Sequence, residues 1–174
     1  MLNNLLVYRL AIFNILCLAA LSWAWQRGFV SDMFGNDRSY MTYAAAGLFM
    51  AGSVSCLARA AKVGSILNSL KLGGHPQVSA VKFEAKAAHL DDVGDLIVTV
   101  GLTGTAIGVV MMLHSFSAGS LSDPAKIVET ATALGDGVGT AFRSTIVSAI
   151  AWCWHLDNLR MLKTATTLML EDAN

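Results

Sequence analysis

Three aspartates, Asp91, Asp92 and Asp95, lie together just before a long apolar segment of the sequence. One explanation is structural, because carboxylates near the N-terminal end of a helix are stabilised by its dipole. A second explanation is chemical: around a pore, these side chains would form a ring of carboxylates that concentrates cations at one mouth. Asp95 is the best candidate for such a ring, and the choice depends on whether the segment that follows crosses a membrane.

The other reactive side chains favour neither an enzyme nor a metal site. The cysteines, Cys17, Cys56 and Cys153, are far apart within or beside apolar segments, so we interpret them as packing residues. His114 and His155 have no second ligand at metal spacing and fit packing near opposite membrane faces. The sequence also lacks a glycine-rich phosphate loop and a Ser/His/Asp arrangement. We therefore expect no enzymatic activity, no cofactor and no bound metal.

The composition predicts a membrane protein. Only 14% of the residues are charged and 55% are hydrophobic, whereas a typical soluble domain has roughly 25% charged residues. A helix needs about 20 apolar residues to cross the hydrocarbon layer, and only helices or closed barrels can do so. Segments of about this length lie at 5–25, 40–60, 95–116 and 138–156. We predict an all-α, polytopic membrane protein with about four transmembrane helices, in one membrane domain over 1–174.

The connections between these segments predict the orientation. Four lysines lie within 61–94, where a Gly-Gly-His-Pro break separates two expected helices. The connection over 117–137 has a single lysine and a short helix that begins near Pro124. Because Lys and Arg gather in cytoplasmic loops, 61–94 and both termini should be cytoplasmic and 117–137 should lie on the outer face.

Two of the apolar segments are unusually rich in small residues. Gly101, Gly104 and Gly108 recur at helical spacing, so one face of the third segment has almost no side chains. A neighbouring backbone can therefore approach it closely. The fourth segment is similar in kind, with many glycine, alanine and serine residues. This periodicity is equally consistent with plain helix association and with packing around a pore.

The same two segments carry sequence motifs. Residues 101–108 read Gly-Leu-Thr-Gly-Thr-Ala-Ile-Gly, which is similar to a G-L-x-G-T-x-x-G signature. Residues 134–150 have a Gly-x-x-x-Ala start, then a threonine, then small residues. In this order and spacing the motifs resemble the penultimate and final membrane helices of the MotA/TolQ/ExbB family of proton-channel (stator) proteins. The resemblance covers residues 91–160, under half of the chain.

The resemblance implies an assembly and an activity. Family members form a homopentamer around a single-span partner of the ExbD/TolR/MotB kind, whose membrane helix carries an essential Asp. They lie in the bacterial inner membrane and use H⁺ or Na⁺ flow to drive mechanical work. This chain would then be one subunit of such a stator, with its partner acting outside the inner membrane.

The resemblance also assigns an ion pathway. Thr105 and Thr145 match the threonines of the two motifs, and both should lie near the middle of the membrane, since Thr105 is about 15 Å beyond Asp95 at 1.5 Å per residue. Rings of hydroxyls could accept a hydrogen bond from a carboxyl group or coordinate water or Na⁺. Alternatively, each threonine could bond a carbonyl of its own helix. The predicted pathway comprises Thr105, Thr145, Thr140, Ser148 and Asp95.

The chain also departs from the family pattern. Thr140 occupies the position of a glutamate in the final helix of ExbB and TolQ, so a carboxylate inside the membrane must come from the partner. Arg143 is the one cation well inside a predicted span, and we expect it to reach the surface or to pair with Asp136. The alternative function is that of a non-conducting tetraspan scaffold or assembly protein. The sequence distinguishes neither H⁺ from Na⁺ nor the process that is powered.

Overall fold

The computed structural model describes residues 2–71, 80–116 and 124–171, and within these ranges every regular element is a helix. The order is α1 (Leu2–Gln26), α2 (Phe29–Gly35), α3 (Met41–Lys71), α4 (Ala80–Phe116) and α5 (Pro124–Glu171). The predicted all-α class is therefore confirmed. The short helix α2 was not predicted, because the turn-forming residues around it indicated an irregular connection.

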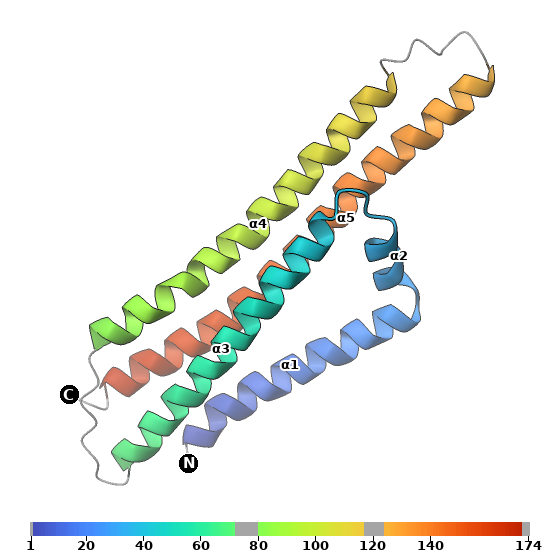
Figure 1. Ribbon diagram of the computed structural model, residues 1–174. Helices are drawn as coiled ribbons and strands as arrows, with labels where there is room; N and C mark the ends of the chain where they lie inside the picture. Colours follow the sequence, from blue (N-terminus) through green and yellow to red (C-terminus); the bar gives the residue numbers. More distant parts are fainter. Residues whose placement is uncertain (1, 72–79, 117–123, 172–174) are drawn as a thin grey trace.

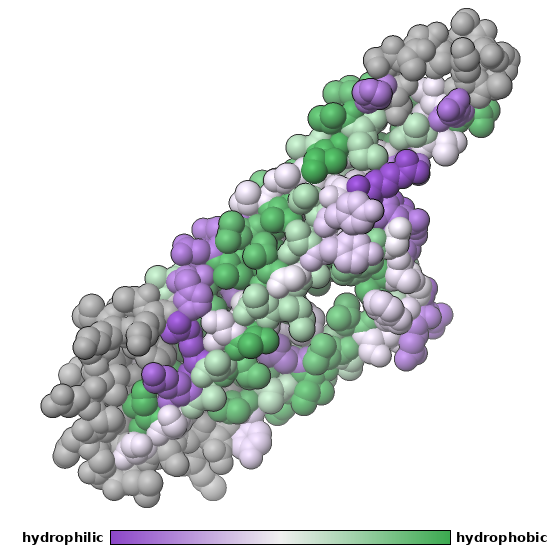
Figure 2. Space-filling model, in the orientation of Figure 1, coloured by the Kyte–Doolittle hydropathy of each residue, from purple (hydrophilic) through white to green (hydrophobic). Residues whose placement is uncertain are grey.

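The helices form an elongated bundle (Figure 1). The two longest, α4 and α5, run antiparallel side by side, and their paired ends extend beyond α3, which packs along both of them. Helix α1 diverges from the bundle towards α2, and both chain termini lie towards the same end. Hydrophobic side chains cover much of the visible surface, with hydrophilic ones near α2 and towards the end that holds the termini (Figure 2).

Three of the helices are long and apolar enough to cross a membrane, over Val7–Gln26, Met41–Ile66 and Ala88–His114. This agrees with the first three predicted segments and supports a membrane protein. The fourth predicted segment, 138–156, lies within α5 but is not among them. Its serines, threonines, glycines and Arg143 dilute the apolar residues, so the count of four spans is not confirmed.

The predicted connections are mostly helical. Helix α3 continues to Lys71 and α4 begins at Ala80, so each helix extends well into 61–94. The Gly-Gly-His-Pro break lies outside the described residues. Helix α5 does begin at Pro124, as the fixed φ of proline at a first helical position predicts. It then continues without interruption, so the separate short helix expected within 117–137 is instead the start of α5.

Buried residues on the two longest helices recur in alternating steps of three and four. This heptad pattern is typical of helices that pack along a shared left-handed seam. On α4 the buried positions are Leu90, Gly94, Ile97, Gly101, Gly104 and Gly108, and on α5 they include Gly137, Ala141, Ser144, Ser148, Ala151, His155, Asn158, Leu162 and Ala165. Small residues thus fill the seam towards α2, and larger ones form an apolar core towards the chain termini.

Asn14 attaches α1 to α5. Its amide nitrogen donates hydrogen bonds to the Leu10 carbonyl and to Asn158 Oδ1, each at 2.8 Å. Its Oδ1 accepts one from Trp154 Nε1 at 2.7 Å and one from Asn158 Nδ2 at 3.2 Å. All four hydrogen-bonding positions of the amide are used, which fixes the register of an otherwise exposed helix, because an unpaired amide is costly in an apolar medium.

Asp37 organises the start of α3. It is 4% exposed, and its Oδ1 accepts hydrogen bonds from the Ser39 amide at 2.9 Å and the Ser39 hydroxyl at 2.6 Å. Its Oδ2 accepts one from the Thr42 amide at 2.8 Å. Burial alone would raise the pKa of this carboxyl, but the hydrogen bonds from Ser39 and Thr42 together lower it below the usual value.

We expect Asp37→Asn to reduce the free energy of unfolding by about 1–2 kcal/mol at pH 7, because the amide nitrogen would face a backbone donor. A lowered pKa means that the carboxylate stabilises the fold above about pH 4 and loses this effect as the pH falls through its folded value. The difference between the two proteins in thermal unfolding in detergent should therefore shrink between pH 5 and pH 3. Exposed Glu129→Gln is the control, and equal midpoints for Asp37→Asn and the unmodified protein at pH 7 would contradict the role.

Candidate functional site

The contact between α4 and α5 depends on glycine. A Cβ added at Gly108 would lie 2.6 Å from both the Ala141 nitrogen and the Gly137 carbonyl oxygen. One added at Gly101 would lie 2.6 Å from the Ser148 Cβ, and Gly104 faces Ser144 equally closely. The glycine face predicted from the sequence therefore lies directly against α5, and side chains would force the two backbones apart.

Thr105 and Thr145 meet at the edge of this contact. Their Oγ1 atoms are 2.5 Å apart, although the residues are 40 positions apart in sequence. Each hydroxyl also lies within hydrogen-bonding distance of a carbonyl of its own helix, Thr105 at 3.0 Å from Gly101 O and Thr145 at 2.9 Å from Ala141 O. The bond to the own helix carbonyl, one of the alternatives that the sequence left open, is therefore present at both threonines, and their role in an ion pathway stays a prediction.

The hydrogens of this pair can be counted. Each hydroxyl has one hydrogen, so two hydrogens serve three contacts. One hydroxyl must donate to the other, and the accepting hydroxyl donates to its own helix carbonyl. Both hydrogens are then used in hydrogen bonds within the chain, and only oxygen lone pairs remain for a ligand. The Thr105–Thr145 pair can therefore accept a hydrogen bond or coordinate a cation, and it does not favour a carboxylate anion.

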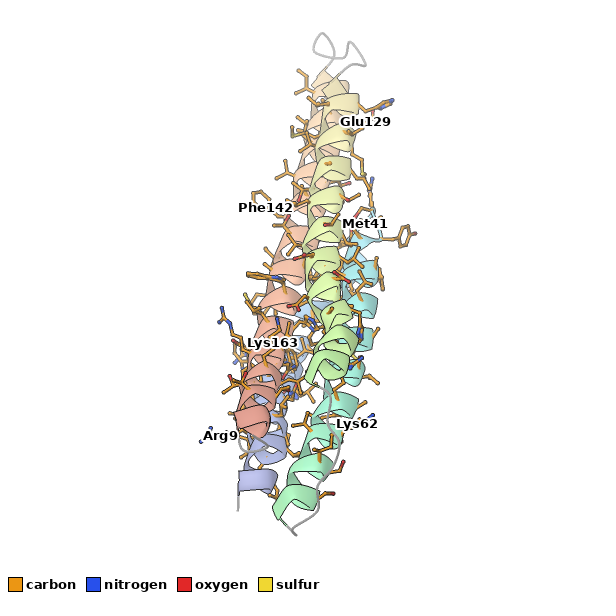
Figure 3. All side chains as sticks on the ribbon, turned by 90° about the vertical axis from the view of Figure 1, so that its left-hand side faces the viewer. Arg9, Met41, Lys62, Glu129, Phe142 and Lys163 are labelled. Carbon is orange, nitrogen blue, oxygen red and sulfur yellow. The ribbon has the colours of Figure 1, made fainter. Side chains whose placement is uncertain are left out.

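The pair borders an exposed apolar surface. Thr105 is half-buried and directly follows the buried Gly104. Thr145 is exposed and directly follows the buried Ser144. Around them, Leu102 is 63% exposed and Phe142 is 62% exposed, and Phe142 points away from the bundle in Figure 3. A ligand or a second chain that covers this apolar surface can form hydrogen bonds with its hydroxyl groups.

Thr140 and Ser148 do not share this position. They are 0% and 3% exposed, and both face the interior of the bundle, because they lie with Ser144 on the inner side of α5. Neither Oγ atom has a hydrogen-bond partner among the described residues. Within one chain both are therefore packing residues, and their role in a pore lining stays a prediction.

Asp95 is exposed at the start of the apolar part of α4, and its carbonyl oxygen accepts a hydrogen bond from Thr99. Asp91 instead forms an ion pair with Lys163 of α5, with 2.7 Å between Asp91 Oδ1 and Lys163 Nζ. Asp92 is exposed. The cluster therefore divides, with one member joining α4 to α5, and a role of Asp95 in a carboxylate ring stays a prediction.

Arg143 does not pair with Asp136, which corrects the expected partner. Its Nη2 lies 3.8 Å from Asp32 Oδ2 on α2, and its Nη1 donates to the Asn36 carbonyl at 3.3 Å. Asp136 instead pairs with Arg38 at 2.7 Å. Both arginines thus join α5 to the segment between α1 and α3. These contacts could not be predicted, because α2 itself was unexpected.

His155 packs between helices, beside the first residues of the apolar segment Ala88–His114. It is 1% exposed, and its ring packs against Gly52 of α3 and Gly94 of α4. Its Nε2 is 2.8 Å from the Leu90 carbonyl and therefore carries the hydrogen. The heptad spacing from Ser148 to His155 is the signal that could have predicted this burial. His114, by contrast, is exposed.

In the part of the chain that the structure describes, no three His, Cys, Asp or Glu side chains are grouped to hold a metal ion. Fold and composition define the chain as a helical membrane protein. No family model matches it, and no curated protein or solved structure shows significant similarity to it. The resemblance of residues 101–108 and 134–150 to stator proteins therefore stays a prediction.

We expect Gly108→Ala to lower the free energy of unfolding by about 1–3 kcal/mol, because the new methyl group meets backbone atoms that cannot rotate away. Gly135→Ala is the matched control, since nothing lies within 4 Å of its added Cβ. Its helix propensity should make it neutral or stabilising by up to about 1 kcal/mol. Thermal unfolding in detergent measures both, and equal midpoints would contradict the close contact.

Proposed function

We propose that this chain is a subunit of an ion-driven stator, in which a homopentamer encloses a single-span partner and couples H⁺ or Na⁺ flow to mechanical work across a bacterial inner membrane. The observation that carries the proposal is the contact between Thr105 and Thr145 at 2.5 Å. Two hydroxyls from different helices meet there, at the edge of an exposed apolar surface. A ring of such pairs would supply repeated polar positions in an otherwise apolar lumen.

The topology of the proposal has four spans. Helix α4 contains an apolar segment long enough to cross a membrane, and α5 packs antiparallel along it. Helix α5 would then cross the membrane together with α4. Its many polar groups would face α4 or form hydrogen bonds with carbonyls of α5 itself. Segment 138–156 would then be a span sheltered by neighbouring helices and neighbouring subunits. Both termini would be cytoplasmic.

The partner would supply the carboxyl group. Within the proposed spans this chain has no acidic side chain at the level of Thr105 and Thr145. The pair offers only oxygen lone pairs, which suits a protonated carboxyl group, a water molecule or Na⁺. A single-span helix with an Asp fits this requirement, because its carboxyl could donate to the pair when protonated and would lose that interaction on ionisation.

The alternative function is a non-conducting tetraspan scaffold. A specific observation favours it too: each threonine lies within hydrogen-bonding distance of its own helix carbonyl, as threonines in membrane helices do without any ion pathway. The glycine contact between α4 and α5 would serve a scaffold equally well. The two functions differ in whether the exposed hydroxyl edge is used.

The test removes one hydroxyl at a time. Thr105→Val and Thr145→Val should each reduce ion flux by about tenfold or more, the effect of losing a hydrogen bond of about 1.4 kcal/mol in the pathway. Flux is measured in liposomes that contain the complex purified from its own host through a tag on this chain, with H⁺ and Na⁺ gradients imposed separately. Thr105→Ser, which keeps the hydroxyl, should restore most of the flux.

Thr103→Val is the matched control, because this exposed threonine of the same helix donates to the Thr99 carbonyl at 2.8 Å and has no other hydrogen bond among the described residues. Ion flux through the complex with this variant should equal that through the unmodified complex. Full flux in both Thr105→Val and Thr145→Val would exclude the pore role. Native mass spectrometry of the same sample should give five copies of this chain, whereas a dimer or tetramer without flux would establish the scaffold.

A further inference from the structure

A second polar cluster lies between α3 and α4, away from the Thr105–Thr145 pair. The Ser55 hydroxyl oxygen is 3.0 Å from His89 Nε2, and Arg59 Nη2 is 3.4 Å from His89 Nδ1. Ser55 and Arg59 are half-buried on α3, one turn apart, and His89 is exposed on α4. We refer to these three residues as the α3–α4 polar cluster.

The direction of the hydrogen bonds in this cluster follows from the guanidinium group. Arginine only donates, so His89 Nδ1 must accept from Arg59. The hydrogen of the neutral ring is then on Nε2 and is donated to Ser55, which leaves the serine hydroxyl hydrogen and the remaining guanidinium hydrogens for another molecule. The α3–α4 polar cluster therefore offers hydrogen-bond donors and a positive charge, which is the chemistry of an anion site.

Arg59 of this cluster forms no ion pair with a carboxylate among the described side chains. Among the side chains that the structure describes, the ion pairs within 4 Å involve Arg38, Arg143, Arg160 and Lys163, and none involves Arg59. Lys62, one turn further along α3, is exposed (Figure 3), and so is Asp92. Among the described side chains near the cluster, Arg59 and Lys62 are positive and Asp92 is negative.

The depth of the cluster indicates the source of the anion. Arg59 lies seven residues inside the apolar segment Met41–Ile66, and His89 is the second residue of Ala88–His114. Seven residues correspond to about 10 Å, which is within the reach of a lipid headgroup and a snorkelling arginine. A cation at that depth is costly unless it is neutralised. Leu96, seven residues beyond His89 and half exposed, continues the same side of α4 as an apolar surface.

We propose that Ser55, Arg59 and His89 bind a phosphate group, held on an anionic phospholipid whose acyl chains lie along α3 and α4. The guanidinium group would pair with the phosphate oxygens, and the Ser55 hydroxyl would donate to the same group. Inorganic phosphate has the same chemistry, so it is the second source to be distinguished. The site is independent of ion conduction and would operate in a stator and in a scaffold alike.

The experiment measures binding to the purified full-length protein in non-ionic detergent by native mass spectrometry, together with the shift in thermal unfolding. Three probes are used: phosphatidylglycerol, diacylglycerol with the same acyl chains, and inorganic phosphate. Retention of phosphatidylglycerol but not of diacylglycerol supports the site with a lipid source. Stabilisation by millimolar inorganic phosphate, with displacement of the lipid, supports the site with free phosphate as its source. Equal retention of both lipids, with no effect of phosphate, overturns the proposal.

Variants locate the binding. Arg59→Gln and Ser55→Ala should weaken retention of phosphatidylglycerol by about tenfold and about threefold, respectively, as expected for one charged and one neutral hydrogen bond. Arg160→Gln is the matched control, because it removes one exposed cation near the same end of the bundle and outside the α3–α4 polar cluster. Retention of phosphatidylglycerol by this variant should stay within twofold of that by the unmodified protein. If Arg160→Gln weakens binding as much as Arg59→Gln, or if a folded Ser55→Ala protein binds normally, the site is refuted.

Discussion

The close approach of α4 and α5 is the constraint on which the rest of the structure depends. Gly101, Gly104 and Gly108 bring the two backbones so near that a single Cβ would collide with the partner helix. In a membrane, where lipid is as apolar as leucine, helices associate through such packing more than through hydrophobic burial. The seam sets the register of α5, and this register decides which polar side chains face inwards and which reach the surface.

That register separates two kinds of hydroxyl on one helix. Thr140, Ser144 and Ser148 follow the seam and are buried, whereas Thr145 is one residue out of phase and meets Thr105 at the open edge. One residue corresponds to about 100° of rotation, so the register that the glycine contact sets keeps the two sets on different sides of α5. The glycine contact therefore positions the candidate site, although no glycine takes part in its chemistry.

Much of the fold and of the contact between α4 and α5 could be predicted from the sequence. Apolar length predicted four spans, of which three coincide with helices long and apolar enough to cross a membrane. Glycine spacing predicted the face of α4 that meets α5. The burial of Thr140 and Ser148 could not be predicted, because α5 is small and polar on several sides and its hydrophobic pattern does not reveal the inner face. The heptad register with α4 does reveal it. The partner of Arg143 was missed because Asp32 and Asn36 belong to a segment whose helix and position depend on tertiary contacts.

The polar groups of the helices also show how the chain uses its charges. Near α2, arginines pair with aspartates, and Lys163 pairs with Asp91 towards the opposite end, so these cations join helices to one another. Asn14 joins α1 to α5 without any charge. The Thr105–Thr145 pair offers acceptors without a donor, and the α3–α4 polar cluster offers donors without an acceptor. The two sites thus have opposite hydrogen-bonding chemistry, which is why we propose a different class of ligand for each.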